Sequence, residues 1–161
     1  MAFNGLIESV KTEDLSSFST LPLYSPGLKH KSTGNEYSYV YAVAAIGTGK
    51  YCTLEVSGTS LTSGYSVNVS NASLNGWMAG VAQNTINAST YGWVMTKGVS
   101  LIAADSGEVS AAPGVDLALG TNGGFVAAGG TFSTAPRFGV TINSFVTTVG
   151  TSKARIFGSI L

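Results

Sequence analysis

The spacing of hydrophobic side chains changes near Glu36, and this change divides the chain into two parts. From Glu36 onward, apolar and polar positions alternate with a period of two, which is the pattern of strands with one buried face. The predicted strands are 36–44, 51–56, 65–69, 77–82, 91–101, 115–119, 125–128, 138–142, 145–149 and 154–160. A spacing of about ten residues is typical of all-β proteins. The sequence therefore predicts an all-β fold, a compact antiparallel β-sandwich or small barrel, with a jelly-roll-like arrangement among the open alternatives.

Turn-forming residues separate the predicted strands. The segment Tyr24-Ser25-Pro26-Gly27 combines a proline, which fixes φ, with a glycine, which accepts positive φ. Gly34-Asn35 and Asn122-Gly123 are further turn signals, and an Asn-Gly pair suits a two-residue hairpin turn of type I′.

The first part of the chain has a different pattern. Residues 1–23 alternate isolated apolar side chains with Ser, Thr and charged residues, and Pro22 limits any helix to a short one. We interpret 1–23 as an extended N-terminal arm and 24–161 as one β domain. The arm residues expected to contact a partner or a neighbouring copy are Phe3, Leu6, Ile7, Phe18, Leu21 and Leu23.

The strand predicted at 91–101 has one bulky and one slim face. Tyr91, Trp93 and Met95 point one way, while Gly92 and its alternate neighbours point the other. The bulky face can be part of an ordinary core, or it can pack against another subunit. The second interpretation assigns subunit packing to Tyr91, Trp93 and Met95.

The chain carries very little charge. Asp, Glu, Lys and Arg make up 10% of it, against about 25% in an ordinary domain, and no residue from Val56 through Thr96 is charged. The longest apolar run is much shorter than the about 20 residues of a membrane-spanning helix, and a hydrophobic content of 44% argues against disorder. The remaining explanation for the low charge is a surface covered by other subunits, because the centres of protein interfaces are poor in charged residues.

Few residues offer catalytic or ligand-binding chemistry. The net charge is zero and the basic residues are scattered, which argues against nucleic-acid binding. His30 is the only histidine and is expected in a solvated loop, and Cys52 is expected to be a buried hydrophobe. Asp105 and Glu108 flank a glycine turn, and the glycine-rich 120–124 lacks the context of a phosphate-binding loop. We therefore expect no enzyme, no cofactor and no metal; a β-fold hydrolase is a remote alternative.

Several segments together resemble the head decoration, or cement, proteins of tailed bacteriophages. The resemblance lies in Ser32–Ala42 (STGNEYSYVYA), Gly49–Tyr51, the GVAQ strand at Gly80–Gln83 and YGWVMTKGV at Tyr91–Val99. It covers about 22–105 by pattern and implies a β domain, commonly trimeric, made in the host cytoplasm and bound to the outer capsid surface. The implied partners are the major capsid protein and other copies of the chain, with neither nucleic acid nor membrane, and the implied role is to stabilise the coat lattice.

A different class of function is also compatible with the sequence. Three tyrosines on one face of the predicted strand 36–44, at positions 37, 39 and 41, can stack on sugar rings if they are exposed. The alternative hypothesis is therefore a head-fibre or tail-associated module that recognises glycan on the host surface.

Overall fold

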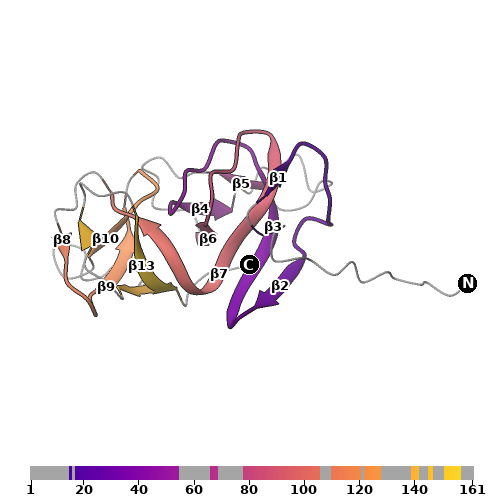
Figure 1. The fold of residues 1–161 in the computed structure, drawn as a ribbon. Helices are drawn as coiled ribbons and strands as arrows, with labels where there is room; N and C mark the ends of the chain where they lie inside the picture. The colour runs from indigo at the N-terminus through magenta and orange to yellow at the C-terminus, as the bar shows by residue number, and fades with distance from the viewer. Residues whose placement is uncertain are drawn as a thin grey trace, which may run out of the picture.

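The computed structural model describes residues 15, 17–54, 66–68, 78–105, 110–120, 122–127, 139–141, 145–146 and 151–156. Within these ranges the regular elements are all β-strands (Figure 1), and nearly all pairings are antiparallel. Each of the ten segments predicted from the sequence overlaps one of these strands. The predicted all-β, antiparallel fold class is therefore confirmed.

The strands follow one another along the chain in short steps. Their bounds are β1 (Phe18–Ser19), β2 (Lys29–Ser32), β3 (Asn35–Ala42), β4 (Tyr51–Leu54), β5 (Ser66–Asn68), β6 (Met78–Ala82), β7 (Thr90–Ala103), β8 (Ser110–Ala111), β9 (Asp116–Leu119), β10 (Phe125–Ala127), β11 (Gly139–Thr141), β12 (Phe145–Val146) and β13 (Thr151–Ile156). The short β1, β2 and β8 were not predicted.

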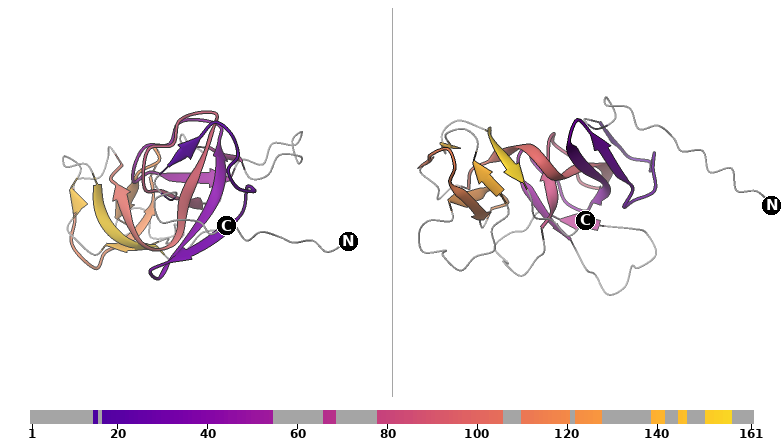
Figure 2. Two further views of the ribbon diagram at one scale, coloured as in Figure 1. Left: turned by 45° about the vertical axis from the view of Figure 1, so that its right-hand side comes forward. Right: turned by 90° about the horizontal axis from the view of Figure 1, so that it is seen from below.

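The long strand β7 belongs to two groups of strands. Its first half pairs with β3, from Ala42 opposite Thr90 to Glu36 opposite Lys97, and its second half pairs with β13. The strand bends between these halves (Figures 1 and 2), at Gly98, which has a φ of 122°. Only glycine adopts such a φ easily, so the bend has a local cause in the sequence.

The group around the first half of β7 curls back on itself. The pairings run from β3 to β7, β6, β4 and β5, and β5 pairs again with β3 in the parallel direction. The joins through β5 involve only two residue pairs each. The other group contains β13, β11, β9 and β10, and Phe125 of β10 forms a bridge to Ala104 just beyond β7.

Two hydrophobic clusters fill the inner sides of these groups. The first consists of Val40, Ala42, Ile46, Cys52, Ala79, Ala82, Ile86 and Val94. The second consists of Tyr51, Met78, Val81, Ile102, Leu117, Phe125, Ala154 and Ile156. Because the second cluster takes residues from β4 and β6 as well as from β9, β10 and β13, it ties the two groups together.

Turn geometry agrees with the sequence in one place and differs in two. The two-residue turn between β2 and β3 consists of Thr33 and Gly34, with φ of 49° and 82° as in type I′, one residue before the predicted Gly34-Asn35, because Asn35 already pairs with Ser32. Pro26-Gly27 occupies the centre of a turn closed by the Leu28 N–H and the Ser25 carbonyl. The type I′ prediction for Asn122-Gly123 is wrong, because the loop between the paired residues Leu119 and Phe125 is longer.

The described part of the predicted arm contributes the short strand β1 to the sheet. Phe18 and Ser19 form β1, which pairs with Gly92 and Tyr91 of β7. Phe3, Leu6 and Ile7 lie outside the described residues.

Candidate functional site: the outer face of β3 and β7

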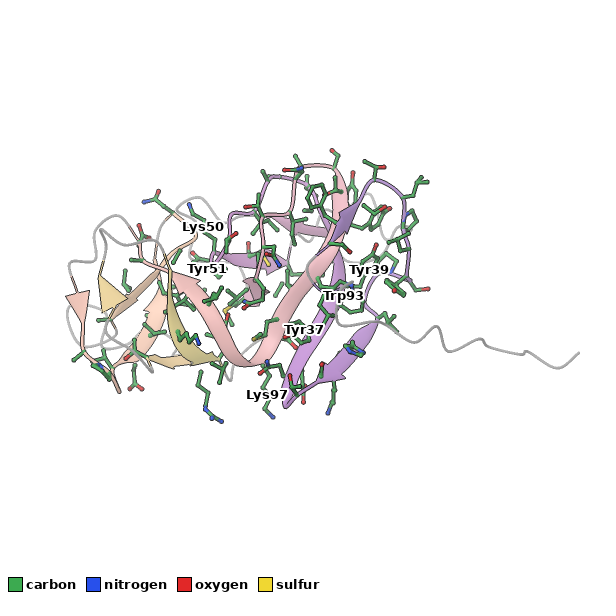
Figure 3. All side chains as sticks on the ribbon, in the orientation of Figure 1. Tyr37, Tyr39, Lys50, Tyr51, Trp93 and Lys97 are labelled. Atoms are coloured by element: carbon green, nitrogen blue, oxygen red, sulfur yellow. The ribbon has the colours of Figure 1, made fainter. Side chains whose placement is uncertain are left out.

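The side of β3 and β7 that faces away from the first core is rich in aromatic rings. The register places Tyr41 opposite Tyr91, Tyr39 opposite Trp93, and Tyr37 opposite Met95. Directly opposite residues of an antiparallel pair point to the same face. The alternation read from the sequence therefore puts both sets of bulky side chains on one surface, called here the aromatic face (Figure 3).

The middle of the aromatic face is closed by the chain that precedes β2. The ring of Tyr24 lies 5.3 Å from that of Tyr39 and 5.5 Å from that of Trp93. The Leu23 N–H donates to the Tyr39 hydroxyl at 3.1 Å, and the Gly27 N–H donates to the Tyr39 carbonyl at 2.7 Å. These contacts hold residues 23–27 against β3.

Burial changes the acidity of Tyr39. Desolvation by the rings around it raises the pKa of its phenol, and hydrogen bonds from the backbone of Leu23 and Tyr24 offset part of this rise. The phenol therefore stays neutral across the physiological range.

Apolar side chains stay exposed beside the covered rings. Leu21, Leu23 and Phe18 are 71%, 53% and 49% exposed. All three were predicted to contact a partner. The register places Phe18 opposite Gly92, so its side chain lies on the other face of β7 from Tyr91. Exposure of this kind marks interaction surfaces when the side chains are close together.

The residues predicted for subunit packing differ in burial. Trp93 and Met95 are 3% and 2% exposed within the single chain, so both side chains are buried beneath the aromatic face. Tyr91 is half-buried and packs against Tyr41 with ring centroids 4.9 Å apart. Subunit packing by these residues stays a prediction, and Tyr91 is the one that reaches the surface.

The tyrosines of the glycan hypothesis also differ in burial. Tyr39 is 2% exposed and has no free face for a sugar ring. Tyr37 and Tyr41 are half-buried. The three tyrosines therefore do not form one open stacking platform.

Charged residues gather at the other end of β3 and β7. Lys31 and Glu36 form an ion pair at 3.0 Å, and Lys97 lies opposite Glu36 in the register (Figure 3). The hydrogen bond from Lys31 is the main cause that lowers the pKa of Glu36, and the positive charges of Lys97 and Lys29 act in the same direction. His30 lies between Lys29 and Lys31 in β2, half-buried, and its ring centroid is 6.2 Å from that of Trp93, so the expectation of a solvated loop histidine is wrong.

The glycine-rich loop after β9 encloses a carboxylate. Asp105 is buried and accepts hydrogen bonds at 2.9 Å from both the backbone N–H and the side-chain amide of Asn122. A Cβ on Gly120 or Gly124 would overlap Asp105 or its backbone. The glycines are therefore needed for close packing around Asp105.

Other polar and ionisable groups have structural surroundings. The Cys52 thiol is buried and donates to the Gly80 carbonyl at 3.3 Å, and burial strongly raises its pKa. No group of three or more His, Cys, Asp or Glu residues in the described ranges is arranged to hold a metal ion. The described residues also include no helix long and apolar enough to cross a membrane.

Two side chains that sequence reasoning did not single out hold the bend of β7. Asn35 accepts a hydrogen bond from the Val99 N–H at 3.0 Å. Two residues further along β7, Gln83 accepts from the Leu101 N–H at 3.1 Å and donates to Ser100 Oγ at 2.7 Å. Gln83 is the last residue of the GVAQ segment, so this segment of the resemblance contributes to the bend of β7. For Asn35, the sequence indicated only a preference for turns.

No protein-family model and no curated protein matches this chain. Among solved structures, the chain is similar to the head fiber gp8.5 N base of bacteriophage phi29, with a TM-score of 0.54 and 16% sequence identity. The similarity covers 78% of this chain and 96% of that one. At this level of identity the likeness shows a shared fold.

Proposed function

We propose that this chain is a non-enzymatic structural protein of a phage head, bound to the outer capsid surface as a homo-oligomer, with a trimer as the simplest form. The observation that carries the proposal is the fold likeness to the base of a phage head fibre, which extends over 78% of this chain. The sequence resemblance to capsid cement proteins supports the same location from different evidence.

The exposed apolar residues beside β1 are the proposed attachment point. Leu21 and Leu23 are the more exposed of the large hydrophobic side chains there, and they follow a strand that is fixed to β7. Burying both against the major capsid protein would remove apolar surface from water, at about 25 cal/mol per Å². The same contact would stabilise the coat lattice if one oligomer touches neighbouring capsid subunits.

A fibre base that supports host recognition is the second candidate, and the fold likeness favours it equally, because that solved structure is part of a head fibre. Burial of Tyr39 weakens the version in which the tyrosines of β3 bind glycan. Glycan-array binding that is lost on Tyr37→Ala and Tyr41→Ala would support the recognition role over cementing.

Capsid binding by an apolar-to-polar variant tests the proposal. Leu21→Ser with Leu23→Ser should keep the β domain folded, because both side chains are exposed, but should lower retention on undecorated capsids in co-sedimentation at least about tenfold. The matched control is Val43→Ser, which removes another exposed apolar side chain, one residue beyond the end of β3. Equal retention of the double variant, the control and the unchanged protein would contradict attachment through this surface.

A further inference from the structure

Basic side chains form a continuous stripe across the bend of β7. Lys97 precedes the bend, while Val99 and Leu101 follow it on the same face, since the alternate residues Ser100 and Ile102 are buried. On β13, Arg155 lies opposite Val99 and Lys153 lies opposite Leu101. Lys97, Lys153 and Arg155 are exposed.

The stripe continues onto the hairpin of β2 and β3. Lys31, whose side chain is 77% exposed, pairs with Glu36, and Glu36 lies opposite Lys97. We call Lys31, Lys97, Lys153 and Arg155 the basic stripe. It contains four cations, and Val99 adds an apolar side chain, 39% exposed, at its centre. Of the described carboxylates, Glu36 pairs with Lys31, and Asp116 lies two strands from Arg155, since both are opposite Val140 of β11.

The described part of the chain carries an excess of positive charge. The whole chain has eight basic and eight acidic residues, of which the described ranges contain six basic and three acidic ones. Three of the remaining acidic residues, Glu8, Glu13 and Asp14, fall within seven positions of the N-terminal segment together with one lysine, Lys11. Residues 8–14 are therefore a short anionic segment, and they follow the apolar residues Phe3, Leu6 and Ile7.

The edge of β7 that pairs with β1 is also occupied by another strand. β1 pairs with β7 at Tyr91 and Gly92, on the edge opposite β3. Two residues further along the same edge, β6 occupies Val94 and Met95. Between β1 and Lys97, this edge of β7 is therefore already paired with β6.

We propose that the basic stripe binds residues 8–14 of a second copy of this chain. Each copy then supplies an anionic segment and receives one, and such a head-to-tail contact closes into a ring when the rotation between copies allows it. The contact is built from exposed charges, so it weakens as salt increases. This inference rests on the proposed homo-oligomer and identifies the surfaces that form it.

Charge reversal on either side of the contact tests the inference with the full-length protein. Lys97→Glu with Arg155→Glu reverses the stripe, and Glu13→Lys with Asp14→Lys reverses the segment. Each pair should raise the protein concentration at which half of the chains are assembled, measured by light scattering, about tenfold or more. The combination of all four substitutions should restore assembly, because opposite charges again face each other.

A control with added charge at a different place keeps the test specific. Asn84→Glu with Asn87→Glu adds two carboxylates to exposed positions between β6 and β7 and should leave assembly unchanged. Unfolding temperatures would show that all variants keep the fold. Assembly that is insensitive to both reversals, or that the fourfold variant does not restore, would overturn the inference, while capsid binding by the unchanged protein would still support the proposed function.

Discussion

The side-chain oxygen of Asn35 accepts a hydrogen bond from the backbone N–H of Val99, 3.0 Å away, where β7 turns from one group of strands to the other. The adjacent Gly98 has a φ of 122°, and a Cβ at this position would overlap the side chain of Asn35. The bend thus depends on Gly98, which has no side chain, and on the side chain of Asn35, which fills the space that a Cβ at position 98 would occupy.

Gly98→Ala should lower the free energy of unfolding by about 3 kcal/mol, because it combines an unfavourable φ with a steric overlap. For a chain of this size, the melting temperature should fall by roughly 6–12 °C. The matched control is Gly34→Ala, where φ is 82° but nothing lies within 4 Å of the added Cβ, and about 1 kcal/mol is expected. In an Asn35→Ala background, the added cost of Gly98→Ala should approach that of the control. Equal costs at the two glycines would contradict the proposed role of Asn35.

Gly80→Ala tests the close approach of β6 to β7. The new Cβ would lie 2.8 Å from Val94 Cγ2 and 2.9 Å from the Met95 carbonyl oxygen, so unfolding should become easier by about 1–3 kcal/mol. Gly47→Ala is the comparison, since its Cβ would meet Lys50 only at an ordinary 3.6 Å. Denaturant unfolding of both variants measures the difference, and a neutral Gly80→Ala would show that β6 and β7 are not packed as described.

The Cys52 thiol should not react with a disulfide reagent in the native protein at pH 8. Its side chain is fully buried, and burial raises its pKa, so almost no thiolate is available to attack. Reaction should occur at the rate of an exposed thiol after addition of denaturant. Rapid labelling of the folded chain would place Cys52 at the surface.

Tyr39 should make stability sensitive to alkaline pH. Burial raises the pKa of its phenol in the folded state, so its contribution to stability is complete below the ordinary tyrosine pKa, about 10, and is lost as pH rises through the higher folded value. Unfolding free energy measured between pH 8 and pH 11 should fall less steeply for Tyr39→Phe than for the unchanged protein. Tyr41→Phe is the control, because Tyr41 is half-buried. The same slope for all three proteins would contradict a perturbed Tyr39.

Much of the fold follows from the sequence alone, because period-two alternation and turn residues are local signals. The alternation from Glu36 to Ala42 correctly predicted a strand with its tyrosines on one face, and the tight turn before it lies one residue earlier than the predicted Gly34-Asn35. The short strands β1 and β2 were missed, because two or four residues form no recognisable period and gain their stability from pairing with β7 and β3.

The candidate site was less accessible to sequence reasoning. Tyr24 covers Tyr39 and Trp93 from a turn region, and nothing in the local pattern shows that this turn folds back over the sheet. The same contact explains why Trp93, expected at a surface between subunits, is buried within the chain. The basic stripe depends on the pairing of β7 with β13, between residues about fifty positions apart in the sequence, so the scattered basic residues appear unrelated before the chain folds.

The central claim is that this charge-poor chain is a subunit whose surface is covered in an assembly. The most direct test is the mass of the purified full-length protein in solution, measured by light scattering over a range of concentrations. The chain has a mass of 16.4 kDa, and we predict a defined multiple of it, close to 49 kDa for a trimer. A stable, soluble particle of 16.4 kDa at every concentration would contradict the claim.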